Sequence, residues 1–251
     1  MPYANNHGIN VHYEIEGKGC PLVVMHGFAG SSQDWHDAGF VEGLSADYLL
    51  ILIDERGHGL SDKPHDPRSY AMEKRVDDVI VVLNKLEILK AHFMGYSMGG
   101  EVCFGIAKYA PERTRSLIIG GMHPYAPQYP EVYNQQIQIL TKGIPAAADA
   151  WGQKSPKERG RFLKNDAQAL IASTIAARDW SGCADILPAM KMPCLLYAGE
   201  SDELMYSSIK ECVKHIPNSV FISLPDLIHG DAYVRSDLVL PHIKRFLSEM
   251  R

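Results

Sequence analysis

The sequence has little cysteine and no long hydrophobic run. Its 251 residues include five cysteines, an odd number without a Cys-x-x-Cys pair, which argues against a disulfide framework or a cysteine zinc site and favours reduced thiols. No apolar stretch approaches the roughly 18 residues of a membrane span, and the N-terminus lacks the basic and apolar regions of a signal peptide. We therefore expect a cytoplasmic protein with no membrane partner.

The sequence also lacks an excess of positive charge. Lys and Arg number 25 against 30 Asp and Glu, which gives a formal net charge of −5, and Glu158 interrupts the densest basic stretch at residues 154–164. Nucleic-acid binding needs clustered basic residues on one face, so we expect no nucleic-acid partner. Neither a phosphate-binding Gly-rich motif nor a metal-ligating His cluster is present, and we expect no cofactor and no metal.

Short apolar segments alternate with helical patterns along most of the chain. An alternating segment at residues 9–15 follows an Asn-His-Gly turn and predicts a β-hairpin. Continuous apolar runs, which are typical of strands buried on both faces, come next. These runs lie at residues 22–25, 48–53, 92–94, 117–119, 195–197 and 220–222. Helical periodicity between them, clearest at residues 73–86, predicts an α/β fold with a mostly parallel sheet flanked by helices.

The alternation is interrupted once, between residues 122 and 188. This stretch has no strand-like run and predicts three or four short helices. A helical insertion between parallel strands lies at their carboxyl ends, where such folds bind ligands. We therefore predict a core of residues 1–121 and 189–251 and a helical cap of residues 122–188. We expect Tyr125 and Trp151 of the cap to contact the substrate, the alternative being that they pack the cap onto the core.

The most specific motif is Gly-Tyr-Ser-Met-Gly at residues 95–99, the only Gly-x-Ser-x-Gly match in the chain. An apolar run precedes it, and a helical segment at residues 101–109 follows it. In a sharp strand-to-helix turn the middle residue is strained, and the flanking glycines remove side chains that would collide. We therefore predict that Ser97 is a nucleophile and that Tyr96 beside it contacts the substrate. The alternative is a glycine-rich turn with an incidental serine.

A serine nucleophile needs a base and an acid that orients the base. His229 comes just after the last predicted strand and precedes a glycine, so it can reach over the sheet edge towards Ser97. Asp202 follows the preceding strand, with Glu200 as a less favoured substitute, and gives the chain order Ser, Asp, His. We predict that Ser97, Asp202 and His229 form a catalytic triad, although His229 could instead be a hydrogen-bonded loop histidine.

The tetrahedral intermediate of this chemistry needs backbone N–H donors for its negative charge. We predict one donor at Met98, directly after the nucleophile, and a second at Phe28 in the loop that follows residues 22–25. Gly27 lets the backbone approach the substrate closely, so we count it as a substrate contact. His26 we interpret as a structural residue of the same loop.

These residues resemble those of the α/β-hydrolase superfamily. The nucleophile motif, the His-Gly-Phe loop and the run Asp-Glu-Arg-Gly-His-Gly-Leu-Ser-Asp-Lys-Pro at residues 54–64 are similar to the corresponding loops of that superfamily. The resemblance spans almost the whole chain, is weakest in the cap, and extends to small bacterial serine esterases and lactonases that act on acyl-homoserine lactones or enol-lactones. It implies a mostly parallel eight-stranded sheet with a small helical cap.

The triad predicts a cofactor-independent serine hydrolase that cleaves carboxylic esters through an acyl-enzyme on Ser97. The resemblance extends this expectation to lactones such as N-acyl homoserine lactones, a quorum-quenching activity. The alternatives are C–C bond hydrolysis, perhydrolysis or acyl transfer with the same triad, or a ligand receptor with this fold. Haloalkane dehalogenases and epoxide hydrolases of the superfamily are disfavoured, because they use an aspartate where this chain has Ser97. The sequence leaves the oligomeric state open.

Overall fold

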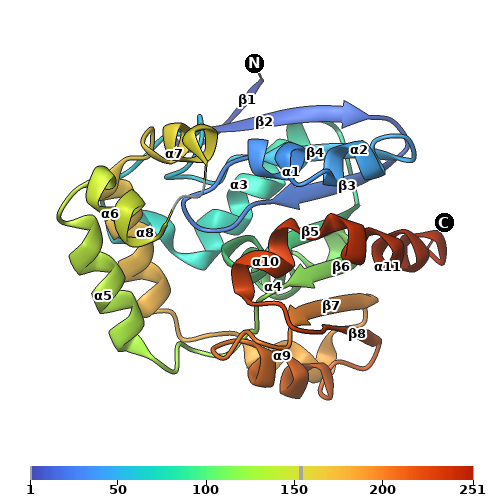
Figure 1. The fold of residues 1–251 in the computed structure, drawn as a ribbon. Helices are drawn as coiled ribbons and strands as arrows, with labels where there is room; N and C mark the ends of the chain where they lie inside the picture. Colours follow the sequence, from blue (N-terminus) through green and yellow to red (C-terminus); the bar gives the residue numbers. More distant parts are fainter. Residues whose placement is uncertain (1, 153–154, 251) are drawn as a thin grey trace.

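A computed structural model describes residues 2–152 and 155–250, and within them one eight-stranded sheet forms the centre (Figure 1). The strand order is β1-β2-β4-β3-β5-β6-β7-β8. Strand β1 pairs antiparallel with β2, β2 pairs antiparallel with β4, and the remaining pairs are parallel. The strands are β1 (Tyr3–Asn6), β2 (Ile9–Gly17), β3 (Cys20–Met25), β4 (Tyr48–Ile53), β5 (Ala91–Tyr96), β6 (Thr114–Gly120), β7 (Cys194–Gly199) and β8 (Ser219–Leu224).

The sheet confirms the predicted fold class. Strand β4 has the predicted bounds, and the hairpin of β1 and β2 turns at His7 and Gly8, both with positive φ. Strands β5 and β7 are buried at every residue. Continuous apolar runs predicted this burial, because a central strand of a parallel sheet has helices on both faces.

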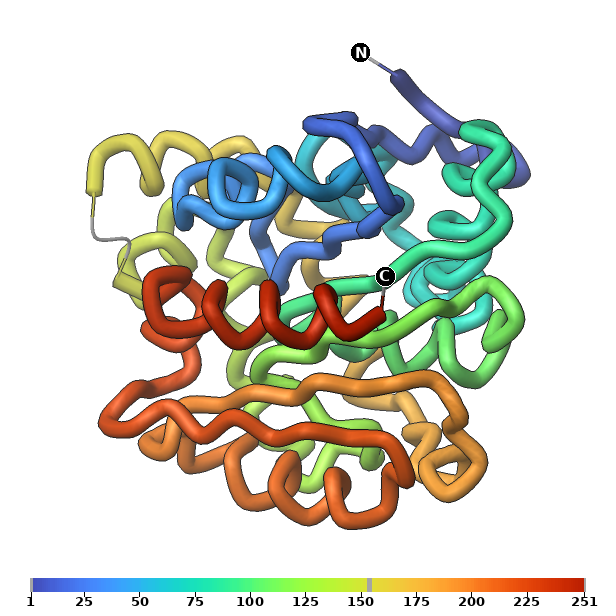
Figure 2. Tube along the Cα trace, turned by 90° about the vertical axis from the view of Figure 1, so that its right-hand side faces the viewer, coloured from blue at the N-terminus to red at the C-terminus, as the bar shows by residue number. Residues whose placement is uncertain are grey.

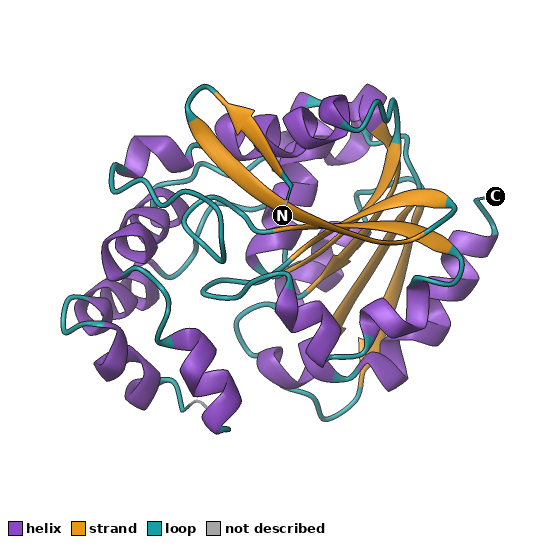
Figure 3. Cartoon of the chain, turned by 90° about the horizontal axis from the view of Figure 1, so that it is seen from above, coloured by secondary structure: helices purple, strands orange, loops and turns teal. Residues whose placement is uncertain are grey.

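Helices cover both faces, so the core has two layers (Figure 3). In β3, Val23 and Met25 point into the first layer and Leu22 and Val24 into the second. The first layer includes side chains of α3 (Met72–Lys85), α4 (Met98–Tyr109) and α9 (Tyr206–Val213). The second includes side chains of α1 (Gln33–Asp37), α2 (Phe40–Leu44), α10 (His229–Val234) and α11 (Ser236–Ser248). Figure 2 shows α11, in red, in front of the sheet and running roughly along the direction of its strands.

The insertion between β6 and β7 forms the helical cap, whose helices lie together at one side of the molecule (Figure 1). Its helices are α5 (Pro130–Leu140), α6 (Ile144–Ala150), α7 (Pro156–Phe162) and α8 (Ala167–Arg178). They share a small apolar cluster that includes Leu140, Phe162 and Leu170. A backbone bridge between Tyr125 and Gly182 joins the two ends of the insertion. The predicted cap range, 122–188, includes residues 153 and 154, which lie outside the described residues, and its boundaries stay a prediction.

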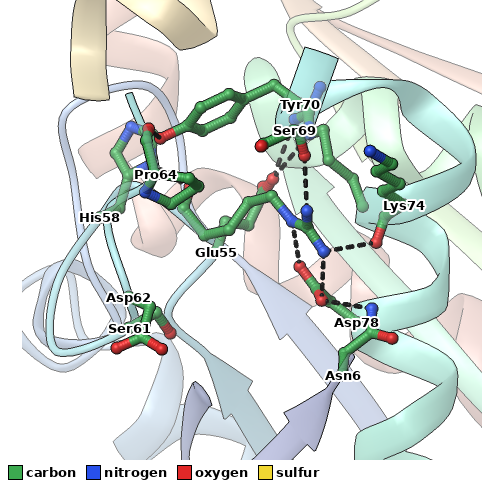
Figure 4. Close-up of polar contacts among 12 residues, drawn as sticks. Asn6, Glu55, His58, Ser61, Asp62, Pro64, Ser69, Tyr70, Lys74 and Asp78 are labelled. Atoms are coloured by element: carbon green, nitrogen blue, oxygen red, sulfur yellow. Dashed lines mark hydrogen bonds and ion pairs between the residues drawn. The ribbon is translucent and has the colours of Figure 1, made fainter. Parts of the chain in front are cut away.

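The loop after β4 is fixed by a buried ion pair. Arg56 donates from Nε and Nη2 to the two carboxylate oxygens of Asp78 on α3, each at 2.6 Å, and Asn6 donates to Asp78 Oδ1 at 2.7 Å (Figure 4). Arg56 also donates to the carbonyl oxygens of Ser69 and Lys74. Buried charges are stable when they are paired and hydrogen-bonded, so this bidentate contact holds the loop against α3. The loop therefore has an architectural role.

No helix within residues 2–152 and 155–250 is both long and apolar enough to cross a membrane.

Candidate active site

Ser97 lies in the sharp turn between β5 and α4. Its backbone is at φ 52° and ψ −114°, a strained conformation for a residue with a side chain. Two glycines make the turn sterically possible. A Cβ atom on Gly95 would lie 2.2 Å from the Gly99 carbonyl oxygen, and a Cβ atom on Gly99 would lie 2.2 Å from the Met25 carbonyl oxygen. The motif thus packs the turn closely against the end of β3 and places Ser97 at the N-terminus of α4.

Ser97, His229 and Asp202 form one chain of hydrogen bonds. Ser97 Oγ lies 3.0 Å from His229 Nε2, and His229 Nδ1 lies 2.6 Å from Asp202 Oδ2. A carboxylate can only accept, so the imidazole proton is on Nδ1, and Nε2 accepts from the Ser97 hydroxyl. Asp202 is only 5% exposed, and its Oδ1 accepts the backbone N–H of Met205 at 3.2 Å. The sequence places these residues after three different strands, and the fold brings them within hydrogen-bonding distance.

Tyr96 supports His229 and does not line the cavity beside Ser97. Its hydroxyl donates to the His229 carbonyl oxygen at 2.5 Å, and its ring centroid lies 5.3 Å from that of the imidazole. The side chain is buried, at 1% exposure, and burial raises its pKa well above the usual value, so the hydroxyl keeps its proton. The predicted contact of Tyr96 with substrate therefore has no support in this geometry, and the residue acts on the backbone of His229 instead.

Phe28 and Met98, the predicted oxyanion donors, both line the cavity beside Ser97. Met98 is the first residue of α4, so its N–H has no acceptor within the helix. In the described part of the chain the Phe28 N–H likewise donates to no backbone acceptor. Two unused N–H groups next to a serine hydroxyl are the arrangement that binding an oxyanion requires.

The side chain of His26 orders the loop that carries Phe28. Its Nε2 accepts the backbone N–H of Glu55 at 3.2 Å, so the proton is on Nδ1, which donates to the Gly27 carbonyl oxygen at 2.8 Å. This geometry agrees with the interpretation of His26 as a structural residue. Gly27 packs against Ser97, since a Cβ atom built on it would lie 3.7 Å from Ser97 Cβ, but Gly27 is not part of the cavity wall.

A cavity of about 380 Å³ is lined by the triad, the Phe28 loop and the cap. Tyr125, predicted to contact substrate, lines it. Trp151, predicted to do the same, does not. It packs edge-on against Phe28 and Phe162, with ring centroids 6.2 and 5.7 Å away. The alternative of cap packing therefore describes Trp151, while Trp180 is the cap tryptophan at the cavity.

The cavity wall also contains polar residues that the sequence analysis did not assign to the site. His123 follows β6, is buried, and accepts the backbone N–H of Tyr125 at Nδ1, 3.3 Å away. Burial lowers its pKa. Arg75 of α3 and Glu101 of α4 form a buried ion pair at 2.5 Å. One sequence signal could have found Glu101: it lies four residues after Ser97, in the first turn of the helix that follows the nucleophile.

A second cavity of about 350 Å³ adjoins the first. Arg75, Glu101, Ala177 and Trp180 line both cavities and therefore form the boundary between them. Within residues 2–152 and 155–250, no group of three or more His, Cys, Asp or Glu side chains is arranged to hold a metal ion.

Comparison with known proteins gives a consistent result for the fold. Residues 21–145 match the sequence family described as alpha/beta hydrolase fold. The chain is 28% identical to a Synechocystis sp. protein named "Putative non-heme chloroperoxidase", over 98% of this chain and all of that protein. Solved structures share the fold. The enol-lactonase from Burkholderia xenovorans has a TM-score of 0.88 at 24% identity, over 98% of this chain and 100% of that chain. A thermophilic esterase from Thermogutta terrifontis has a TM-score of 0.85 at 23% identity, over 99% and 98%.

Proposed function

Because this chain has the α/β-hydrolase fold and resembles bacterial esterases and lactonases, we propose that it is a serine hydrolase that cleaves carboxylic esters, lactones among them. The observation that carries the proposal is the hydrogen-bonded chain from Ser97 Oγ through His229 to Asp202, with distances of 3.0 and 2.6 Å. A hydroxyl, an imidazole and a carboxylate in this order are the parts of a nucleophile that is activated by an oriented base.

In the proposed reaction, Ser97 Oγ attacks the carbonyl carbon of the ester while His229 Nε2 takes the hydroxyl proton. The carbonyl oxygen becomes an oxyanion, to which the N–H groups of Phe28 and Met98 donate. Asp202 keeps the other imidazole proton on Nδ1 and stabilises the imidazolium. The C–O bond to the alcohol then breaks, and His229 gives its proton to the leaving oxygen. The acyl group stays on Ser97.

Water completes the cycle. His229 accepts a proton from water as the water oxygen attacks the acyl carbon, and Ser97 leaves with the proton that His229 returns. The products are a carboxylic acid and an alcohol. In a lactone the alcohol remains tethered to the acyl group, so the product is a single hydroxy acid whose mass exceeds that of the substrate by one water.

A fluorophosphonate probe tests the nucleophile directly, because it reacts with activated serines. We expect a covalent adduct on Ser97, no adduct in Ser97→Ala, and an adduct of normal yield in Ser173→Ala, since Ser173 lines the same cavity without a basic partner in the described residues. Hydrolysis of p-nitrophenyl butyrate should fall at least about 10³-fold in Ser97→Ala. Equal labelling of Ser97→Ala and the wild-type protein would refute the proposed function.

The lactone part of the proposal needs its own test. Most of the cavity wall is apolar, including Met122, Val132, Leu204 and Met205, which suits an acyl chain. N-acyl homoserine lactones of increasing chain length are the first lactones to test, with ring opening followed by mass spectrometry. If simple esters are hydrolysed and no lactone opens, the ester proposal stands and the quorum-quenching proposal falls.

A second candidate reaction, perhydrolysis, is favoured by the full-length similarity to the relative named as a chloroperoxidase. In this reaction hydrogen peroxide replaces water and attacks the acyl group on Ser97, which gives a peracid and free serine. The peracid can then oxidise bromide, and bromination of a phenol dye reports it. We expect any such activity to require both a carboxylic ester or acid and Ser97. Bromination by Ser97→Ala would exclude this route.

A further inference from the structure

Three charged side chains from different parts of the chain meet at the wall of the active-site cavity. Arg75 donates to Glu101 Oε2 at 2.5 Å through Nη1, and to Glu55 Oε2 at 2.8 Å through Nη2. Arg75 Nη2 also donates to the Met98 carbonyl oxygen at 3.1 Å, so the cluster adjoins the predicted oxyanion donors. All three charged side chains are buried, and Arg75 and Glu101 line the cavity.

The cluster has one guanidinium for two carboxylates, so it carries one excess negative charge when all three groups are ionised. Glu55 Oε1 is sealed from solvent without a hydrogen-bond partner. Glu101 Oε1 also accepts no hydrogen bond from the described residues, but it is not sealed in this way, and its residue faces the cavity. A buried carboxylate oxygen without a donor is unfavourable. A ligand in the cavity that supplies an N–H or O–H group would give Glu101 Oε1 a hydrogen-bond donor.

Tyr133 of cap helix α5 lines the same cavity. Burial raises its pKa to about 12, and the nearby Glu101 carboxylate adds to that effect. The Tyr133 hydroxyl has no hydrogen-bond partner among the described residues. An unpartnered carboxylate oxygen from the core and an unpartnered hydroxyl from the cap therefore border one space.

We propose that Glu101 and Tyr133 bind a hydrogen-bond donor, a hydroxyl or ammonium group, on the far end of the substrate while its ester group lies at Ser97. This inference rests on the proposed function and names the substrate class for it. Glu101 accepts from the donor, and Arg75 holds the carboxylate in place. The wall of the same cavity is mostly apolar and accommodates the hydrocarbon chain that joins the ester to this donor. A carboxylate on the substrate would meet Glu101 with like charge and is disfavoured.

Four methyl esters of equal chain length test the inference: methyl hexanoate, methyl 6-hydroxyhexanoate, methyl 6-aminohexanoate and monomethyl adipate. Their hydrolysis at neutral pH is followed in a pH-stat, and the corresponding octanoate series covers a second length. For the wild-type protein we expect kcat/KM of the hydroxy and amino esters to exceed that of the adipate about tenfold or more, because hydrogen bonds to a charged group are strong. The hydroxy ester should also exceed the plain ester.

Two variants act on the two proposed contacts. Glu101→Gln keeps an acceptor for Arg75 but removes the charge, and we expect it to lower the ratio of amino ester to plain ester about tenfold. Tyr133→Phe should lower the ratio of hydroxy ester to plain ester, and it leaves the buried ion pair untouched. If Glu101→Gln fails to fold, Tyr133→Phe still tests the inference. Ratios within one variant cancel any general loss of catalytic efficiency.

Glu131→Gln is the matched control, since Glu131 is exposed on α5 and does not line the cavity. It should leave all ratios as in the wild-type protein. Equal kcat/KM for all four wild-type reactions at both lengths would overturn the inference, and so would unchanged ratios in both Glu101→Gln and Tyr133→Phe. Absence of both ester hydrolysis and fluorophosphonate labelling would refute the proposed function itself, which is a separate outcome.

Discussion

The substitution Tyr96→Phe tests whether Tyr96 positions the base, His229, or contacts the substrate. The substitution removes the hydroxyl that donates to the His229 carbonyl oxygen at 2.5 Å and leaves the ring in place. We expect kcat to fall and KM to stay nearly constant, because the altered contact is with the backbone of the base. A residue in contact with substrate would instead change KM.

The magnitude follows from one buried hydrogen bond. Such a bond contributes about 1 kcal/mol to the free energy of unfolding, so we expect Tyr96→Phe to destabilise the protein by about that amount in urea unfolding. If the same free energy is lost in holding His229 for reaction, kcat falls about fivefold, since about 1.4 kcal/mol corresponds to a factor of ten.

Tyr233→Phe is the matched control for this prediction. The Tyr233 ring packs against that of Tyr96, with centroids 4.8 Å apart, but its buried hydroxyl has no hydrogen-bond partner. Removing this hydroxyl should leave stability unchanged or slightly increased, and kcat unchanged. A rise in KM at constant kcat for Tyr96→Phe, or equal effects of the two substitutions, would show that the reasoning about Tyr96 is incorrect.

Three further predictions concern the triad, the loop after β4 and the buried His92. Asp202→Asn should lower kcat about 10⁴-fold in steady-state kinetics, because an amide cannot keep the His229 proton on Nδ1. Asp78→Asn should lower the free energy of unfolding by about 3–5 kcal/mol, because Arg56 loses its buried counter-charge, while the kcat of the folded fraction is retained. Burial, together with a nearby arginine charge, lowers the pKa of His92 from 6.5 to about 4, so the unfolded chain binds more protons in that interval and stability should fall as pH drops through it. Urea unfolding across this range should show a weaker pH dependence for His92→Gln.

The strands could be predicted from the sequence because a strand that is buried on both faces must be apolar along its whole length. Residues 48–53 are apolar throughout, and β4 has those bounds. The helical insertion was predicted because residues 122–188 contain no strand-like run, and the starts of its helices also carry recognisable signals. Pro156 and Pro130 are the first residues of α7 and α5, and the Asp166 side chain accepts N–H groups at the start of α8.

Side-chain roles at the cavity were harder to predict, because they depend on contacts between distant segments. Tyr96 adjoins the nucleophile in sequence, but the partner of its hydroxyl is His229, which lies 133 positions later. Trp151 is an aromatic residue of the cap like Tyr125, and only the fold shows that Phe28 covers it. Arg75 is a charged residue within an amphipathic helix. Its burial follows from carboxylates on two other segments, which the pattern of α3 alone does not reveal.

The residues shared by the two cavities separate the space beside Ser97 from a second space of similar volume. The partition consists of an ion pair from the core, Arg75 and Glu101, and two cap side chains, Ala177 and Trp180. None of these four belongs to the nucleophile, the base or its acid. Joining the two cavities into one larger cavity therefore requires no change in Ser97, His229 or Asp202. A smaller side chain in place of Trp180 would thus enlarge the space that adjoins Ser97 and leave the triad as it is.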